Sequence, residues 1–121
     1  MCSVHADAEH QAPIDLRHLQ ETSEGDRAFE KELFSLYMSD CSDGLSRLTL
    51  AQEAGEHETV RHEAHAISGA SGNVGAKQLR LLSSALEKAA EQKTDSQALV
   101  QAVAKEWKRV QTFIQEYLQT I

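Results

Sequence analysis

Hydrophobic residues recur along this chain at the spacing of α-helices. From residue 14 onward they stand three or four positions apart, which places them on one face of a helix. β-branched residues are sparse in this region, and Ala, Leu, Glu, Gln and Lys dominate it. These residue types favour helices over strands. The pattern therefore predicts an all-α protein.

Capping and turn residues divide the pattern into five predicted helices. An aspartate is a candidate N-cap for a short first helix, glycines end the second and third helices, and a capping-box sequence starts the fifth. Four long amphipathic helices joined by short loops predict an antiparallel four-helix bundle, with the short N-terminal helix covering one end. The predicted break points are, in chain order, Asp15, residues 23–26, Gly55, Gly75 and residues 94–97.

The first residues of the chain lack this periodicity. Residues 1–13 are polar and end at Pro13, the single proline of the sequence. We expect residues 1–13 to form a flexible tail and residues 14–121 to form one helical bundle domain, because 121 residues suffice for a single modest core.

A histidine and two glycines stand out in the third predicted helix. Its buried face is predicted to consist of Val60, Ala64, Ile67, Ser71 and Val74. His65 lies about 100° from this face, so its imidazole is expected to be accessible from solvent. Gly69 and Gly72 follow His65 on the same row of the helix. Each costs roughly 0.5–1 kcal/mol relative to alanine, so we interpret them as clearing space beside the ring, either for a neighbouring helix of the same fold or for a second protein.

A solvent-accessible imidazole with glycines on the same row of the helix is suited to phosphoryl transfer. With a pKa near 6.5, an ordinary imidazole is largely neutral at cellular pH, and its ring nitrogen can carry a covalent phosphoryl group. The transfer itself depends mainly on positioning and on charge stabilisation. The chain contains no glycine-rich ATP-binding loop and no kinase signature, so we do not expect it to phosphorylate itself from ATP.

The sequence around the histidine resembles a known family. Residues 64–76 read AHAISGASGNVGA and are followed by Leu79 and by the pair Leu86-Glu87. This pattern resembles the signature of histidine-containing phosphotransfer (HPt) domains, which runs roughly AHxLKGSxxxxGAxxL with a Leu-Glu pair on the next helix. HPt proteins are small helical bundles that accept a phosphoryl group from an aspartate of one receiver domain and pass it to another.

The resemblance implies roles for individual residues. His65 corresponds to the phosphoacceptor and Gly69 to a glycine at which the partner approaches closely. The lysine that usually follows the histidine by three residues is Ser68 here, so we expect Arg61 or Lys77 to supply positive charge instead. A phosphocarrier of this kind needs no cofactor of its own, because Mg²⁺ is expected on the receiver domain.

One further surface residue and a docking patch are predicted near the histidine. Glu87 is expected to be a solvated carboxylate, with orientation of the imidazole as the alternative. On the second helix, apolar residues extend beyond a core face of about 100°. Their surplus predicts a docking patch beside His65 for response regulator receiver domains and a sensor (hybrid) histidine kinase, with burial in the core as the alternative. The patch residues are Phe34, Met38 and Leu45.

The net charge and the cysteines indicate which classes of partner to exclude and which cellular compartment to expect. The formal net charge of −7 and the absence of a basic helix face argue against binding to nucleic acid or to an anionic membrane. Two cysteines form no disulfide framework, and no segment resembles a signal peptide or a membrane span. We therefore expect a free-standing monomer in the cytoplasm.

Two alternatives remain open from the sequence. Glu58, His62 and His65 can share a helix face and offer three metal ligands, although their spacing matches no established zinc pattern. The second alternative is a degenerate HPt protein that binds receiver or kinase domains as an adaptor without phosphotransfer. The neutral Ser68 gives that alternative some support.

Overall fold

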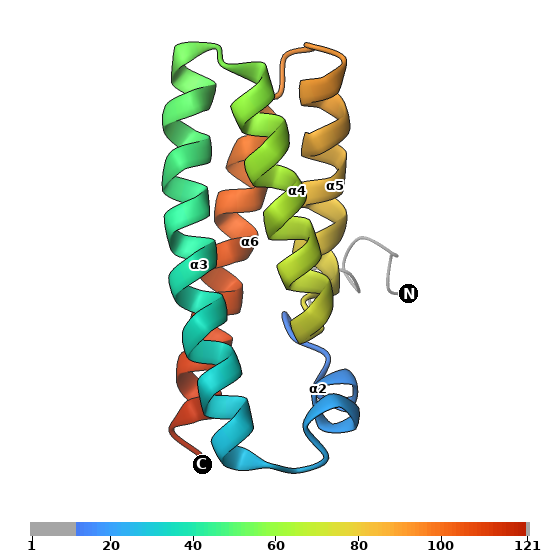
Figure 1. Ribbon diagram of the computed structural model, residues 1–121, viewed down its shortest axis with the longest axis vertical. Helices are drawn as coiled ribbons and strands as arrows, with labels where there is room; N and C mark the ends of the chain where they lie inside the picture. Colours follow the sequence, from blue (N-terminus) through green and yellow to red (C-terminus); the bar gives the residue numbers. More distant parts are fainter. Residues whose placement is uncertain (1–11, 121) are drawn as a thin grey trace, which may run out of the picture.

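The chain forms a bundle of antiparallel helices (Figure 1). A computed structural model describes residues 12–120, and within this range all secondary structure is helical. Consecutive long helices alternate in direction, and α2 lies at the end of the bundle where α3 begins and α4 ends (Figure 1). The predicted all-α bundle with a short N-terminal helix is confirmed. The helices are α2 (Leu16–Ser23), α3 (Arg27–Ala54), α4 (His57–Val74), α5 (Lys77–Glu91) and α6 (Gln97–Leu118).

The predicted tail falls largely outside the described residues, which begin at Ala12. Ile14 is fully buried and belongs to the core. The backbone N–H of Asp15 donates a hydrogen bond to the carbonyl of Gly75 (2.9 Å). The N-terminal segment is thereby tied to the turn between α4 and α5.

Most predicted helix boundaries are confirmed by their capping geometry. The Asp15 carboxylate accepts hydrogen bonds from the backbone N–H groups of Arg17 (3.0 Å) and His18 (3.4 Å) at the start of α2. Gly55 and Gly75 end α3 and α4 in the left-handed conformation, with φ of 73° and 86°. Glycine adopts this conformation without the steric cost that other residues incur, so both positions act as helix terminators.

The capping box predicted before the last helix is wrong. Helix α6 begins at Gln97, whose N–H donates to the Asp95 carboxylate (3.1 Å). The Thr94 hydroxyl instead donates backward to the Ala89 carbonyl at the end of α5 (3.1 Å). Thr94 therefore closes the preceding helix, and the start of α6 depends on a local turn at Asp95.

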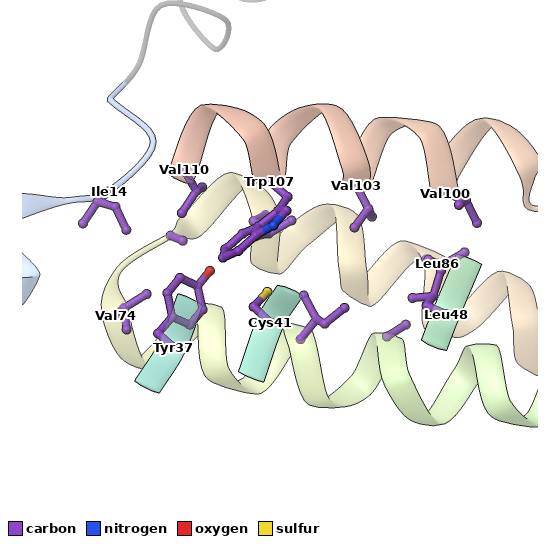
Figure 2. Close-up of a cluster of buried hydrophobic side chains, with 14 of the residues drawn as sticks. Ile14, Tyr37, Cys41, Leu48, Val74, Leu86, Val100, Val103, Trp107 and Val110 are labelled. Carbon is purple, nitrogen blue, oxygen red and sulfur yellow. The ribbon is translucent and has the colours of Figure 1, made fainter. Parts of the chain in front are cut away.

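The core lies between the four long helices. The predicted buried face of α4 is confirmed, because Val60, Ala64, Ile67, Ser71 and Val74 are all buried. Figure 2 shows Tyr37 and Cys41 of α3 directed toward Trp107 of α6. The rings of Tyr37 and Trp107 pack edge to face with centroids 5.5 Å apart. The Tyr37 hydroxyl is hydrogen-bonded to the Ser71 hydroxyl (2.8 Å), which satisfies both buried polar groups.

The buried face of α3 includes one of the predicted docking residues. Phe34 is fully buried, whereas Phe29 and Leu36 are 41% and 60% exposed. The core row alternates steps of three and four residues along the helix. Phe34 is therefore a core residue, and its predicted place in a docking patch is wrong. The core row consists of Phe34, Tyr37, Cys41, Gly44, Leu48 and Ala51.

Candidate functional site

His65 stands on the exposed side of α4. Its side chain is 73% exposed, and its Nδ1 lies 3.0 Å from Oε2 of Glu87 on α5. Within residues 12–120, the structure gives the other ring nitrogen, Nε2, no hydrogen-bond partner. The imidazole is thus held at one nitrogen and open to solvent at the other. Its predicted accessibility from solvent is confirmed.

Glu87 is not the solvated carboxylate that the sequence favoured. Its side chain is only 22% exposed and faces His65 across the contact between α4 and α5. An ionised carboxylate can only accept a hydrogen bond, so this contact favours the tautomer with the proton on Nδ1. The lone pair then resides on Nε2. The sequence did contain a signal for the partial burial of Glu87. Glu87 directly follows the buried Leu86, so it lies at the edge of the core.

Arg61 lies one helical turn before His65, and its guanidinium already forms an ion pair with Glu58. Its Nε donates to a carboxylate oxygen of Glu58 (3.1 Å). The Arg61 guanidinium lowers the pKa of Glu58, and Glu58 in turn raises the pKa of Arg61. The carboxylates of Glu91 and Glu87 add to that increase in the Arg61 pKa. Arg61 is therefore surrounded by negative charge on the His65 side of α4.

Lys77 cannot supply charge beside His65, contrary to the prediction. Its ammonium lies 2.9 Å from the carboxylate of Asp15, and this contact lowers the Asp15 pKa. Lys77 and Glu87 are separated by about 15 Å along α5, since a helix rises about 1.5 Å per residue. Lys77 instead fastens the N-terminal segment to the start of α5.

Ser68 is turned toward α5. Its hydroxyl hydrogen-bonds to the Ser84 hydroxyl (2.7 Å) and donates to the Arg80 carbonyl (3.3 Å). The residue that replaces the family's usual lysine is therefore a neutral link between two helices. It brings no charge to the histidine.

The two glycines after His65 have different surroundings. A Cβ added at Gly69 would meet no atom within 4 Å, so this position faces open space. A Cβ added at Gly72 would lie 3.0 Å from Cδ of Arg80 on α5. The predicted clearance for a partner therefore fits Gly69. At Gly72 a side chain of α5 occupies the space, which fits the alternative of a neighbouring helix of the same fold.

The predicted docking residues do not gather beside His65. Leu45 lines a groove between α3 and α6 together with Trp107, and Met38, two turns earlier on the same row, is half-buried against the core. The exposed Leu36 lies on the opposite flank of α3. One turn after it, Asp40 lines a groove shared with Ala66 of α4.

The alternative metal site is not formed by its predicted ligands. Glu58 is paired with Arg61. Across residues 12–120, no group of three or more His, Cys, Asp or Glu side chains is arranged to hold a metal ion. No helix in the described part of the chain is long and apolar enough to cross a membrane.

Comparison with known proteins identifies the family. The sequence model of the Hpt domain family matches residues 32–119. The chain belongs to the Hpt domain family. This HPt domain also matches a solved structure, the crystal structure of histidine-containing phosphotransfer protein B (HptB) from Pseudomonas aeruginosa PAO1. The TM-score is 0.84 and the identity 26%, over 90% of this chain and 96% of that one.

No curated protein sequence matches this HPt domain at a significant level. The family and the structural neighbour together make the chain a histidine phosphotransfer protein of two-component signalling. HPt domains are phosphocarriers rather than kinases. The family match spans α4 and α5 entirely and so includes the surface around His65 and Glu87.

Proposed function

We propose that this HPt protein is a phosphorelay intermediate whose phosphoacceptor is His65. It accepts a phosphoryl group from the aspartate of one receiver domain and passes it to the aspartate of another. The observation that carries this proposal is the arrangement of the ring: Nδ1 is held 3.0 Å from the Glu87 carboxylate, while the side chain is 73% exposed. A partner can reach such a ring from solvent.

The chemistry requires little from this chain. The Nε2 lone pair attacks the phosphorus of an aspartyl phosphate, the P–O bond to the aspartate breaks, and the aspartate leaves as a carboxylate. No proton moves, because Nε2 carries none when Nδ1 is protonated. The ring becomes a positively charged phosphoimidazolium, and the Glu87 carboxylate stabilises that charge. The reverse reaction delivers the phosphoryl group to the second receiver.

The partner is expected to supply the remaining parts of the reaction. Receiver domains would bring the aspartate and its Mg²⁺, so the HPt protein would need no cofactor of its own. A sensor (hybrid) histidine kinase would lie upstream and a response regulator downstream. The open surface at Gly69, where an added Cβ would meet nothing within 4 Å, supports close approach of such a partner.

The docking surface is proposed to lie on the α3 side of His65. Leu36 is 60% exposed on the flank of α3 that faces α4. Ala66, next to His65, is exposed, and Ala70 one turn later is half-buried. These small side chains and Leu36 offer an apolar strip for an amphipathic helix of the receiver. This strip replaces the one predicted from Phe34, Met38 and Leu45.

The test is incubation of the purified protein with a panel of phosphorylated receiver domains. Phosphotransfer predicts an acid-labile, base-stable label that is lost in His65→Gln. Binding without any label would favour the adaptor function instead. For the docking surface, Leu36→Asp should weaken receiver binding at least tenfold. Leu50→Asp is the matched control, because Leu50 is 68% exposed at the other end of the same helix. Equal effects of the two variants would reject the strip.

A further inference from the structure

The side chain of Arg80 crosses from α5 to the row of α4 that carries His65. Its Cδ lies 3.0 Å from the place where Gly72 would have a Cβ. The Arg80 backbone is fixed there as well, since its carbonyl accepts the Ser68 hydroxyl (3.3 Å). The aliphatic stem of Arg80 therefore packs on α4 at Gly72, and a Cβ at this position would require the stem to shift.

A phosphoryl group on His65 would enter a negatively charged environment. The group carries up to two negative charges, and Glu87 lies 3.0 Å from the other side of the ring. Glu58 and Glu91 are close to Arg61, one turn away. Transfer to this site therefore gains from a cation that is not already neutralised by a carboxylate.

Neither of the cations predicted from the sequence meets this condition. Arg61 is bound to Glu58 and Lys77 to Asp15. Arg80 is exposed, and within residues 12–120 the structure gives it no ion pair. The planar guanidinium is joined to Cδ through the Cδ–Nε bond, about which it can rotate. At Gly69, between Gly72 and His65, no side chain obstructs its movement.

We propose that Arg80 is the charge-supplying residue of the phosphotransfer site. Its guanidinium, seated on Gly72, turns along the open Gly69 row and stabilises the phosphoryl group during transfer to and from His65. The inference rests on the proposed function of His65 and adds a residue from α5 to the site. It also gives Gly72 a packing role, because the aliphatic stem of Arg80 lies against it. Arg80 is a positioning and electrostatic residue, and it does not react.

The test compares single-turnover transfer rates from a phosphorylated receiver to wild-type protein and to Arg80→Gln. We expect the variant to be slower by roughly three- to tenfold at low salt, the size of a solvent-exposed interaction with a doubly charged group. The difference should shrink at about 0.5 M salt, because exposed charges are then screened. Arg80→Lys should keep most of the rate. Lys108→Gln, which removes an exposed charge from α6, is the matched control and should leave the rate unchanged.

The outcomes separate this inference from the proposed function. If wild-type protein acquires no label on His65, the proposed function fails and the role of Arg80 with it. If wild-type protein is labelled and Arg80→Gln reacts at the same rate, only the role of Arg80 is overturned. A loss that persists unchanged at high salt, or an equal loss in Lys108→Gln, overturns it as well. Thermal unfolding of each variant checks that the bundle is intact.

Discussion

The contact between Glu87 and His65 yields a quantitative prediction. The Nδ1–Oε2 distance is 3.0 Å, so the carboxylate both holds the ring and faces the positive charge that forms on phosphorylation. Replacing Glu87 with alanine removes both effects and should slow phosphoryl transfer to His65. Glutamine at this position keeps an acceptor oxygen for Nδ1–H but removes the charge. We therefore expect the rates to fall in the order wild type, Glu87→Gln, Glu87→Ala.

The size of the effect follows from the exposure of the pair. Two unit charges about 4 Å apart attract by about 1 kcal/mol in water and by about 4 kcal/mol at an effective dielectric constant of 20. His65 is 73% exposed and Glu87 22%, which places the pair toward the lower figure. Loss of the hydrogen bond contributes roughly a further 0.5–1 kcal/mol. A total of roughly 1–2 kcal/mol corresponds to transfer that is about 5- to 30-fold slower in Glu87→Ala.

Two measurements examine this prediction. Rapid-quench single-turnover experiments with an excess of phosphorylated receiver give the transfer rate. Long-range ¹H–¹⁵N NMR of the unphosphorylated protein reports which ring nitrogen carries the proton. We expect the proton on Nδ1 of His65 in wild type and in Glu87→Gln, and a mixture of tautomers in Glu87→Ala. Glu91→Gln, with the same charge change one turn along α5, should stay within about twofold of wild type.

Some results would refute the reasoning. A Glu87→Ala protein that transfers within twofold of wild type would show that neither the hydrogen bond nor the charge contributes. Equal losses in the Glu87 and Glu91 variants would indicate a general effect of negative charge on the partner. An unchanged tautomer in Glu87→Ala would show that the ring is oriented by something other than this carboxylate.

Three further predictions concern the core and the surface. Phe34→Ala should destabilise the protein by roughly 3–5 kcal/mol in denaturant unfolding, because Phe34 is fully buried and packs edge to face on Tyr117; a loss below 1 kcal/mol would contradict a core position. Gly69→Ala should raise stability by about 0.5–1 kcal/mol and slow phosphotransfer; faster transfer would argue against close approach there. Burial raises the pKa of the Cys41 thiol to about 12, so in a Cys2→Ser background Cys41 should resist alkylation at pH 8 until the protein is unfolded; rapid alkylation of folded protein would contradict this.

The fold was largely predictable because its signals are local. Capping by Asp15 and termination at Gly55 and Gly75 depend on residues next to the helix ends, and the sequence displays them directly. The buried face of α4 was also correct, since its apolar residues form one narrow row. The start of α6 was not, because the Thr94 hydroxyl bonds to the end of α5, and the sequence does not show which of the two helices it caps.

The buried face of α3 is determined by the helices packed against it. Apolar residues cover more than one face of this 28-residue helix, so periodicity alone does not select the buried row. The packing of Tyr37 against Trp107 and its hydrogen bond to Ser71 select it. Phe34 therefore turns inward, and Leu36 turns out toward solvent.

The site was predictable only where one helix forms it. His65 and Gly69 lie on α4, and their shared row follows from helix geometry. Glu87 and Arg80 come from α5, so their approach to this row depends on how the two helices pack. Lys77, at the start of the same helix, was placed wrongly for the same reason. Sequence spacing within one helix says nothing about which turn of the next helix faces it.

The two glycines of α4 show how a structure can separate a folding requirement from a functional one. A Cβ at Gly72 would lie 3.0 Å from Cδ of Arg80, so packing within the protein gives a reason for that glycine. Alanine at Gly69 would meet nothing within 4 Å, and Gly69 lies inside the helix with no positive φ. Helix propensity therefore favours alanine at position 69 by roughly 0.5–1 kcal/mol, and no contact in the described fold opposes it. A residue that costs stability without serving the fold points to a partner that approaches the helix backbone one turn from His65.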